Sequence, residues 1–62
     1  MQNFGENLKR YRKEAKISQD ELASRMGITP QAVSKWENDL SCPDITTLPK
    51  LAEIFGITTD EL

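Results

Sequence analysis

The feature that most constrains this chain lies at 18–38, which reads SQDELASRMGITPQAVSKWEN. Ser18 is followed three positions later by Glu21, the spacing of a capping box that satisfies free N–H groups at the start of a helix. Gly27 can adopt the left-handed backbone that ends a helix, and Thr29, with a proline directly after it, can cap a second one. The pattern predicts two short helices joined by a tight turn, which is a helix-turn-helix.

Such a unit has two interpretations. In one, the second helix enters the major groove of DNA. In the other, the unit is an ordinary helical hairpin within a small bundle. The spacing favours the DNA interpretation and leaves the hairpin as the alternative.

Length and composition narrow the range of functions. The chain has 62 residues, which is one domain spanning 1–62, and no apolar stretch approaches the roughly 20 residues that cross a bilayer. A single cysteine excludes an internal disulfide and no signal peptide is evident, so a reducing cytoplasm is the expected location. The sequence also has no histidine and no glycine-rich phosphate loop. We therefore expect no enzymatic activity, no catalytic residues, no metal, no cofactor and no small-molecule substrate.

The net charge of −2 is unevenly divided along the chain. Residues 1–35 carry +3, whereas residues 36–62 carry −5. A domain with one basic side can dock on phosphates while its acidic side remains in water. A solvated surface of mixed charge is the alternative, so the charge supports a nucleic-acid partner only weakly.

Apolar residues at helical spacing predict another helix ahead of this unit. Asn3 is its expected N-cap, with Glu6 completing a box-like pair, and Lys16 is expected in its last turn. The predicted inward face of this helix consists of Phe4, Leu8, Tyr11 and Ala15.

Pro49 determines where the helix after the unit begins, because a proline deep inside a helix costs about 3 kcal/mol and one in the first turn costs nothing. We therefore expect Thr46 or Thr47 as the N-cap, and Asp44, capping a longer and kinked helix, is the rival. A further capping-box spacing predicts a fifth helix from Thr59. The predicted fold is all-α, a compact bundle of five short helices.

The second helix of the unit has one polar face. At about 100° per residue, with Val33 pointing inward, the residues on or near the opposite side are Gln31, Ser34, Lys35 and Asn38. Glutamine can contact adenine, lysine can donate to guanine, and serine can bind either a base or a phosphate. We therefore expect this face to contact DNA, and a plain solvated face is the alternative.

The start of the first helix of the unit is a candidate phosphate site. Ser18 and Gln19 lie where free backbone N–H groups attract anions. We expect Gln19 to reach a backbone phosphate with Ser18 beside it, and capping alone is the alternative for both.

Two charged residues fall at the edge of the predicted core. Glu37 lies about 40° from Val33, and Arg12 lies about 40° from Leu8 on the preceding helix. Because a buried carboxylate without a partner is costly, we predict a structural ion pair between Arg12 and Glu37. The alternative is that both side chains extend separately to water.

Taken together, the segments SQDELA, MGIT, VSKWEN and LPKLAEIFGIT resemble the Cro and phage-repressor (Xre) family of helix-turn-helix domains. The resemblance implies a lambda-repressor-like fold of five short helices that binds operator DNA, usually as a dimer. It also implies roles for individual residues: phosphate contact by Gln19 and Asn38, base reading by Gln31 and Lys35 with Thr29 and Ser34 nearby, and an ion pair between Arg12 and Glu37.

The sequence departs from the family pattern at positions that include Asp39 and Pro30. Asp39 stands where the family often has glycine, so the loop after the second helix of the unit can be held differently. Pro30 occupies a position that carries a base-reading amide in some phage repressors, so that contact is absent here.

The leading hypothesis is a sequence-specific DNA-binding domain of a bacterial or phage transcriptional regulator. Its expected partners are double-stranded DNA, read as one operator half-site per copy, and a second copy of the chain. Leu40, Ile57 and Leu62 are candidate dimer contacts, although ordinary burial is an equal alternative for Ile57. The second hypothesis is a protein-interaction module, such as an antitoxin or adaptor, that reuses the same fold.

Overall fold

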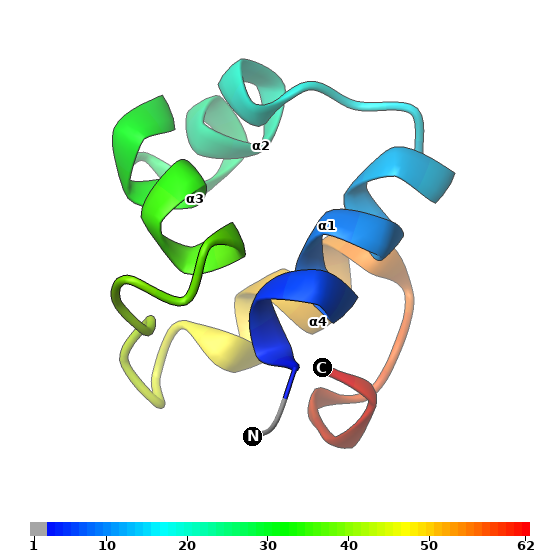
Figure 1. The fold of residues 1–62 in the computed structure, drawn as a ribbon. Helices are drawn as coiled ribbons and strands as arrows, with labels where there is room; N and C mark the ends of the chain where they lie inside the picture. Colours follow the sequence, from blue (N-terminus) through cyan, green and yellow to red (C-terminus); the bar gives the residue numbers. More distant parts are fainter. Residues whose placement is uncertain (1–2) are drawn as a thin grey trace.

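A computed structural model describes residues 3–62 of the chain, so the first two residues of the predicted domain lie outside the described part. The fold is all-helical, as predicted (Figure 1). Its elements are α1 (Phe4–Glu14), α2 (Gln19–Met26), α3 (Pro30–Glu37), α4 (Leu48–Phe55) and a 3₁₀ turn η1 (Thr59–Glu61).

The prediction of five helices is wrong, because the described residues form four α-helices and one turn of 3₁₀ helix. The capping box at Thr58 is present, and its backbone N–H donates to Glu61 Oε1 at 3.0 Å. The bonds that follow span three residues: Glu61 donates to the carbonyl of Thr58, and Leu62 donates to that of Thr59. Three residues cannot close the longer ring of an α-helix, so the cap starts only a single tight turn.

The ends of α2 and α3 lie where the capping signals predict them. Ser18 Oγ accepts from the backbone N–H of Glu21 at 3.0 Å, and Thr29 Oγ1 accepts from the N–H three residues on at 3.3 Å. Gly27 ends α2 with φ of 71°. The carboxylate of Glu21 pairs with Arg25 at 2.9 Å. In the described residues, therefore, the serine half of the capping box is formed, whereas the Glu21 side chain pairs with Arg25 instead of the backbone of Ser18.

Both ends of α1 differ from the prediction. Asn3 has a left-handed backbone, with φ of 64°, and its side chain makes no capping hydrogen bond, so the box with Glu6 is not formed. The helix ends at Glu14, and Lys16 lies beyond it with φ of 61°. Ala15 is exposed rather than inward-facing, because the chain has already left the helix and turns toward α2.

The start of α4 follows the proline argument. Thr47 is the N-cap and Pro49 lies in the first turn, as expected. Asp44 belongs to a separate turn before the helix, in which its carbonyl accepts from the N–H of Thr47 at 2.8 Å. The longer, kinked helix is therefore excluded.

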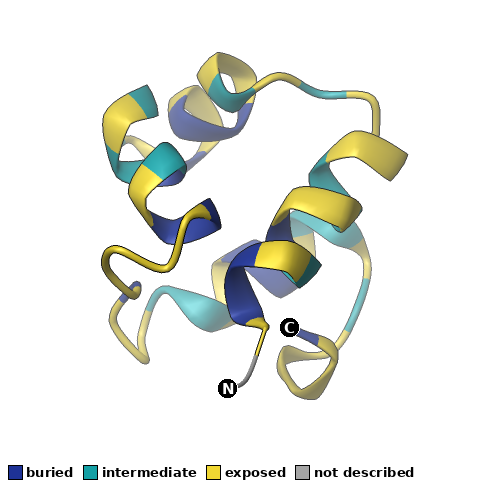
Figure 2. Cartoon of the chain, viewed as in Figure 1, coloured by how far each residue is buried: buried dark blue, intermediate teal, exposed yellow. Residues whose placement is uncertain are grey.

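One core holds the helices together. In this core α2 packs against α3, α3 against α1, and η1 against α4. Figure 2 shows the buried residues on the sides of the helices that face one another. No helix in the described part is long and apolar enough to span a bilayer. The buried apolar residues are Phe4, Leu8, Leu22, Ala23, Met26, Val33, Trp36, Leu51, Ala52 and Leu62.

Gly5 allows the start of α1 to lie directly against the end of α3. A Cβ atom at this position would lie 2.5 Å from the carbonyl oxygen of Glu37 and 2.8 Å from that of Trp36. The backbone N–H of Gly5 donates to Asp39 Oδ1 at 3.1 Å. Helical periodicity gives no sign of this contact, because it treats a glycine in the first turn only as a weak helix former.

We predict that Gly5→Ala destabilises the domain. Helix propensity alone favours alanine by about 0.5–1 kcal/mol, but the overpacking against backbone oxygens costs about 1–3 kcal/mol. The free energy of unfolding from urea denaturation measures the difference. Glu6→Ala, at the exposed neighbouring position, serves as the control, and a Gly5→Ala domain more stable than the original would contradict the close contact.

Candidate nucleic-acid interface

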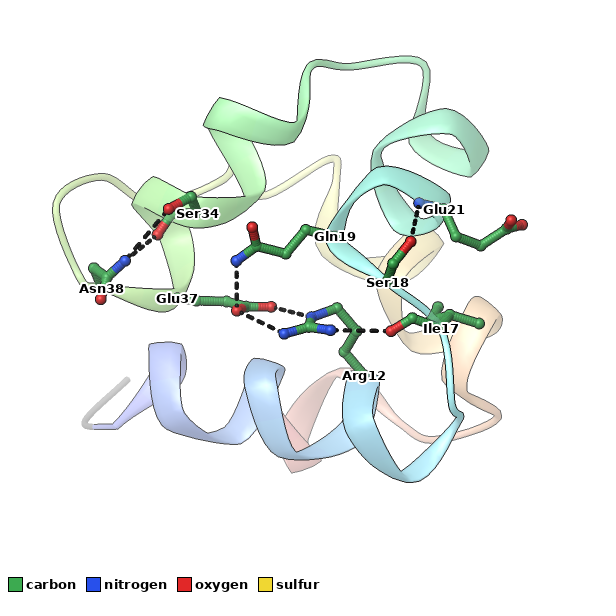
Figure 3. Close-up of polar contacts among 8 residues, drawn as sticks. All are labelled: Arg12, Ile17, Ser18, Gln19, Glu21, Ser34, Glu37 and Asn38. Atoms are coloured by element: carbon green, nitrogen blue, oxygen red, sulfur yellow. Dashed lines mark hydrogen bonds and ion pairs between the residues drawn. The ribbon is translucent and has the colours of Figure 1, made fainter.

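A buried polar network joins the first three helices (Figure 3). Arg12 Nε on α1 lies 2.6 Å from Glu37 Oε2 on α3, and Arg12 Nη2 donates to Glu37 Oε1 at 3.2 Å. Arg12 Nη1 donates to the carbonyl of Ile17 at 3.0 Å, just before α2. Gln19 Nε2 on α2 donates to Glu37 Oε1 at 3.0 Å. The structure therefore brings the expected ion-pair partners together and adds Gln19 to them.

The ion pair within this network is largely shielded from water. The side chain of Glu37 is 2% exposed and that of Arg12 is 11% exposed. Glu37 is also the last residue of α3, where the helix dipole disfavours a negative charge. The fork of Arg12 therefore compensates both the burial of the carboxylate and its place in the helix.

The outward side of α3 has the features expected of a recognition helix. Gln31 and Lys35 are exposed one helical turn apart, and Ser34 is partly buried beside them. The one carboxylate within α3, that of Glu37, is buried against Arg12. A phosphate or base edge approaching this side therefore meets an amide and an ammonium without a neighbouring acid from α3 itself.

Two residues of this region cap α3 with their own side chains. Thr29 caps its start and remains exposed. Asn38 caps its end, because Asn38 Nδ2 donates to the carbonyl of Ser34 at 2.8 Å and lies 3.4 Å from Ser34 Oγ. The two side chains lie at opposite ends of α3, and after capping Thr29 keeps its hydroxyl proton and Asn38 its carbonyl oxygen for a ligand.

The start of α2 is fixed on both sides. Ser18 is exposed and its hydroxyl oxygen caps the helix, while Gln19 is partly buried with its amide nitrogen directed at Glu37. The sequence predicted that Gln19 lies at the start of a helix, but it did not predict the contact of Gln19 with α3. Periodicity describes one helix at a time, so it carries no signal for a bond that depends on how α2 crosses α3.

The chain is similar in sequence to known helix-turn-helix proteins. A family model described as Helix-turn-helix matches residues 8–62. The SPbeta prophage-derived uncharacterized HTH-type transcriptional regulator YonR of Bacillus subtilis (strain 168) is 44% identical over 59 residues, which cover 95% of this chain and 55% of that protein. The chain thus spans about half the length of this relative.

Solved structures that match this fold include a repressor and an epoxidase. The P22 c2 repressor in complex with synthetic operator matches with a TM-score of 0.88 and 30% identity, over 97% of this chain and 91% of that one. The hydroxypropylphosphonic acid epoxidase from S. wedmorenis matches with a TM-score of 0.87 and 34% identity, but the match covers only 32% of that chain.

We predict that the loss of one partner of the buried ion pair destabilises the domain far more than the loss of both partners. Arg12→Met or Glu37→Leu alone leaves a buried charge unpaired, which is expected to cost about 3–5 kcal/mol of unfolding free energy. The double variant should recover most of that loss, because no unpaired charge remains. Urea denaturation of the three variants tests this expectation.

The ion pair between Glu21 and Arg25 provides the matched control, because both side chains are 49% exposed. Its disruption by Arg25→Met should cost less than about 1 kcal/mol. An equal loss from the two pairs would show that burial is not what makes the pair of Arg12 and Glu37 sensitive.

Proposed function

The chain belongs to the helix-turn-helix family of Cro and phage repressors, and on this premise we propose that it is the DNA-binding domain of a bacterial or phage transcriptional regulator. In this proposal α3 enters the major groove of an operator half-site in the cytoplasm.

The exposed face of α3 is the observation that carries the proposal. Gln31 and Lys35 project from a helix whose other side is anchored by fully buried Val33 and by Trp36, which is 7% exposed. A glutamine amide fits the donor and acceptor pair of adenine, and a lysine ammonium fits the acceptors of guanine. Rigid attachment matters because base contacts specify a sequence only if their register is fixed.

The remaining residues around α3 supply further contacts in this proposal. Ser34 and Thr29 lie beside the base-reading pair and contact bases or the adjacent backbone. Gln19 and Ser18 at the start of α2, and Asn38 at the end of α3, contact phosphates. These contacts orient the domain on the duplex without selecting a sequence.

We infer no catalytic activity for this chain, and no cofactor or metal. The similarity to an epoxidase covers about a third of the enzyme, so it shows that the fold also serves as one part of a larger enzyme chain. Function in such cases depends on the side chains that the fold presents, and here those side chains suit DNA.

A homodimer on DNA is part of the proposal. Leu40 is 75% exposed and Ile45 is 82% exposed, and both lie in the loop between α3 and α4. Ile45 also lines a groove with Leu48 and Pro49. Of the three contacts expected from the sequence, Leu62 is buried within its own domain and Ile57 packs against the core, so Leu40 is the one that remains available.

DNA binding is tested by measuring affinity for duplexes, first selected from a random pool, across a range of salt concentrations. Affinity should fall steeply as salt increases, because bound phosphates release counterions. A protein-interaction module would show no such slope with duplex DNA. Gln31→Ala should relax base preference by about 1–3 kcal/mol at one position, whereas Gln19→Ala should weaken binding to all sequences alike. Equal effects from both would contradict the assignment.

Dimer formation is tested with duplexes that carry one half-site or two half-sites about 34 Å apart. The two-site duplex should bind at least about tenfold more tightly per domain, because the second contact becomes intramolecular. Leu40→Ser with Ile45→Ser should abolish this advantage and leave the affinity for one half-site unchanged. An advantage that survives in the double variant would place the dimer contact elsewhere.

A further inference from the structure

Glu37 has two partners with different roles. Its Oε2 lies 2.6 Å from Arg12 Nε, a contact that joins α1 to α3. Its Oε1 accepts from Arg12 Nη2 at 3.2 Å and from Gln19 Nε2 at 3.0 Å. The carboxylate is 2% exposed, so water competes little for either oxygen. The residue that ties the helices together therefore also holds the side chain of Gln19.

The contact with Glu37 fixes the orientation of the Gln19 amide. An ionised carboxylate only accepts hydrogen bonds, so the amide must turn its nitrogen toward Glu37 and its carbonyl oxygen away. Figure 3 shows this orientation, with the two groups converging between α2 and α3. A glutamine without such a partner would exchange among several rotamers and lose that freedom only on binding.

We propose that Glu37 is a positioning residue for phosphate contact by Gln19. The amide nitrogen of Gln19 carries two N–H bonds. One donates to Glu37, and this contact holds the other in a fixed direction, from which it can donate to a phosphate oxygen. Arg12 fixes the carboxylate, the carboxylate fixes the amide, and the amide contacts the DNA backbone. This inference rests on the proposed function, and it explains what holds the Gln19 side chain in place for its contact with the DNA backbone.

The salt dependence of DNA binding distinguishes a positioning role of this network from a direct electrostatic attraction to phosphates. Gln19 is neutral, and Arg12 with Glu37 adds no net charge, so none of them changes the number of phosphates neutralised by lysine and arginine. The salt dependence of binding should therefore stay constant when the network is removed, although affinity falls. A purely electrostatic role for Arg12 would instead change the slope.

The test compares affinities for the selected duplex among Gln19→Ala, the double variant of Arg12→Met with Glu37→Leu, and the combination of all three. The double variant avoids an unpaired buried charge and so keeps the domain folded. Gln19→Ala should weaken binding about tenfold, which is typical for one hydrogen bond to a charged group. The double variant should show most of this tenfold loss of affinity without a change in base preference. The triple variant should bind no more weakly than Gln19→Ala.

Gln31→Ala provides the matched control, because Gln31 is an exposed amide near the start of α3, whereas Glu37 is the last residue of that helix. Its loss of affinity should multiply with that of the double variant, as expected for independent sites. The side-chain amide signals of Gln19 in nuclear magnetic resonance spectra of the free domain should also shift when Glu37 is replaced. Circular dichroism at the temperature of the binding assay verifies that every variant is folded.

Three outcomes would overturn the inference: full affinity in the double variant, losses by Gln19→Ala and the double variant that multiply, or unchanged Gln19 amide signals. Each of these leaves the proposed function intact, since the original domain still binds duplex DNA with a steep salt dependence. Failure of the original domain to bind duplex DNA would instead remove the proposed function and this inference with it.

Discussion

The buried pair of Arg12 and Glu37 is the interaction on which the rest of this small domain depends. Arg12 contacts the end of α3 through two nitrogens and the chain just before α2 through a third, so one guanidinium sets the relation of three helices. A domain of this length buries only about 60% of the surface that its unfolded chain exposes. Apolar contacts set how such short helices pack, and the directional charged fork adds a specific connection between them.

A second contact between helix ends complements the ion pair. The start of α1 meets the end of α3 at Gly5, whose N–H donates to Asp39. Asp39 has φ of 59°, a conformation that usually favours glycine, and its carboxylate compensates by accepting that bond. This explains the departure from the family pattern at this position: the residue turns the chain as a glycine would and also ties α3 to α1.

The two contacts together form a frame that leaves the outward side of α3 free. Every strong polar bond of the frame lies on the inner side of the helices or at their ends, so Gln31 and Lys35 remain exposed. The same fold forms part of an operator-binding repressor and part of an epoxidase. The frame therefore accounts for the shape, and the exposed side chains account for the proposed choice of DNA as partner.

The sequence by itself determined the features that depend on near neighbours. Caps at Ser18 and Thr29 and the proline rule for α4 act within a few residues, and helical periodicity alone placed Arg12 and Glu37 at the edge of the core. Apart from the pair of Arg12 and Glu37, only the tertiary structure decided which groups meet across helices. It directed Gln19 to Glu37, made Gly5 a contact point and buried Leu62, because such contacts depend on crossing angles that no local pattern encodes.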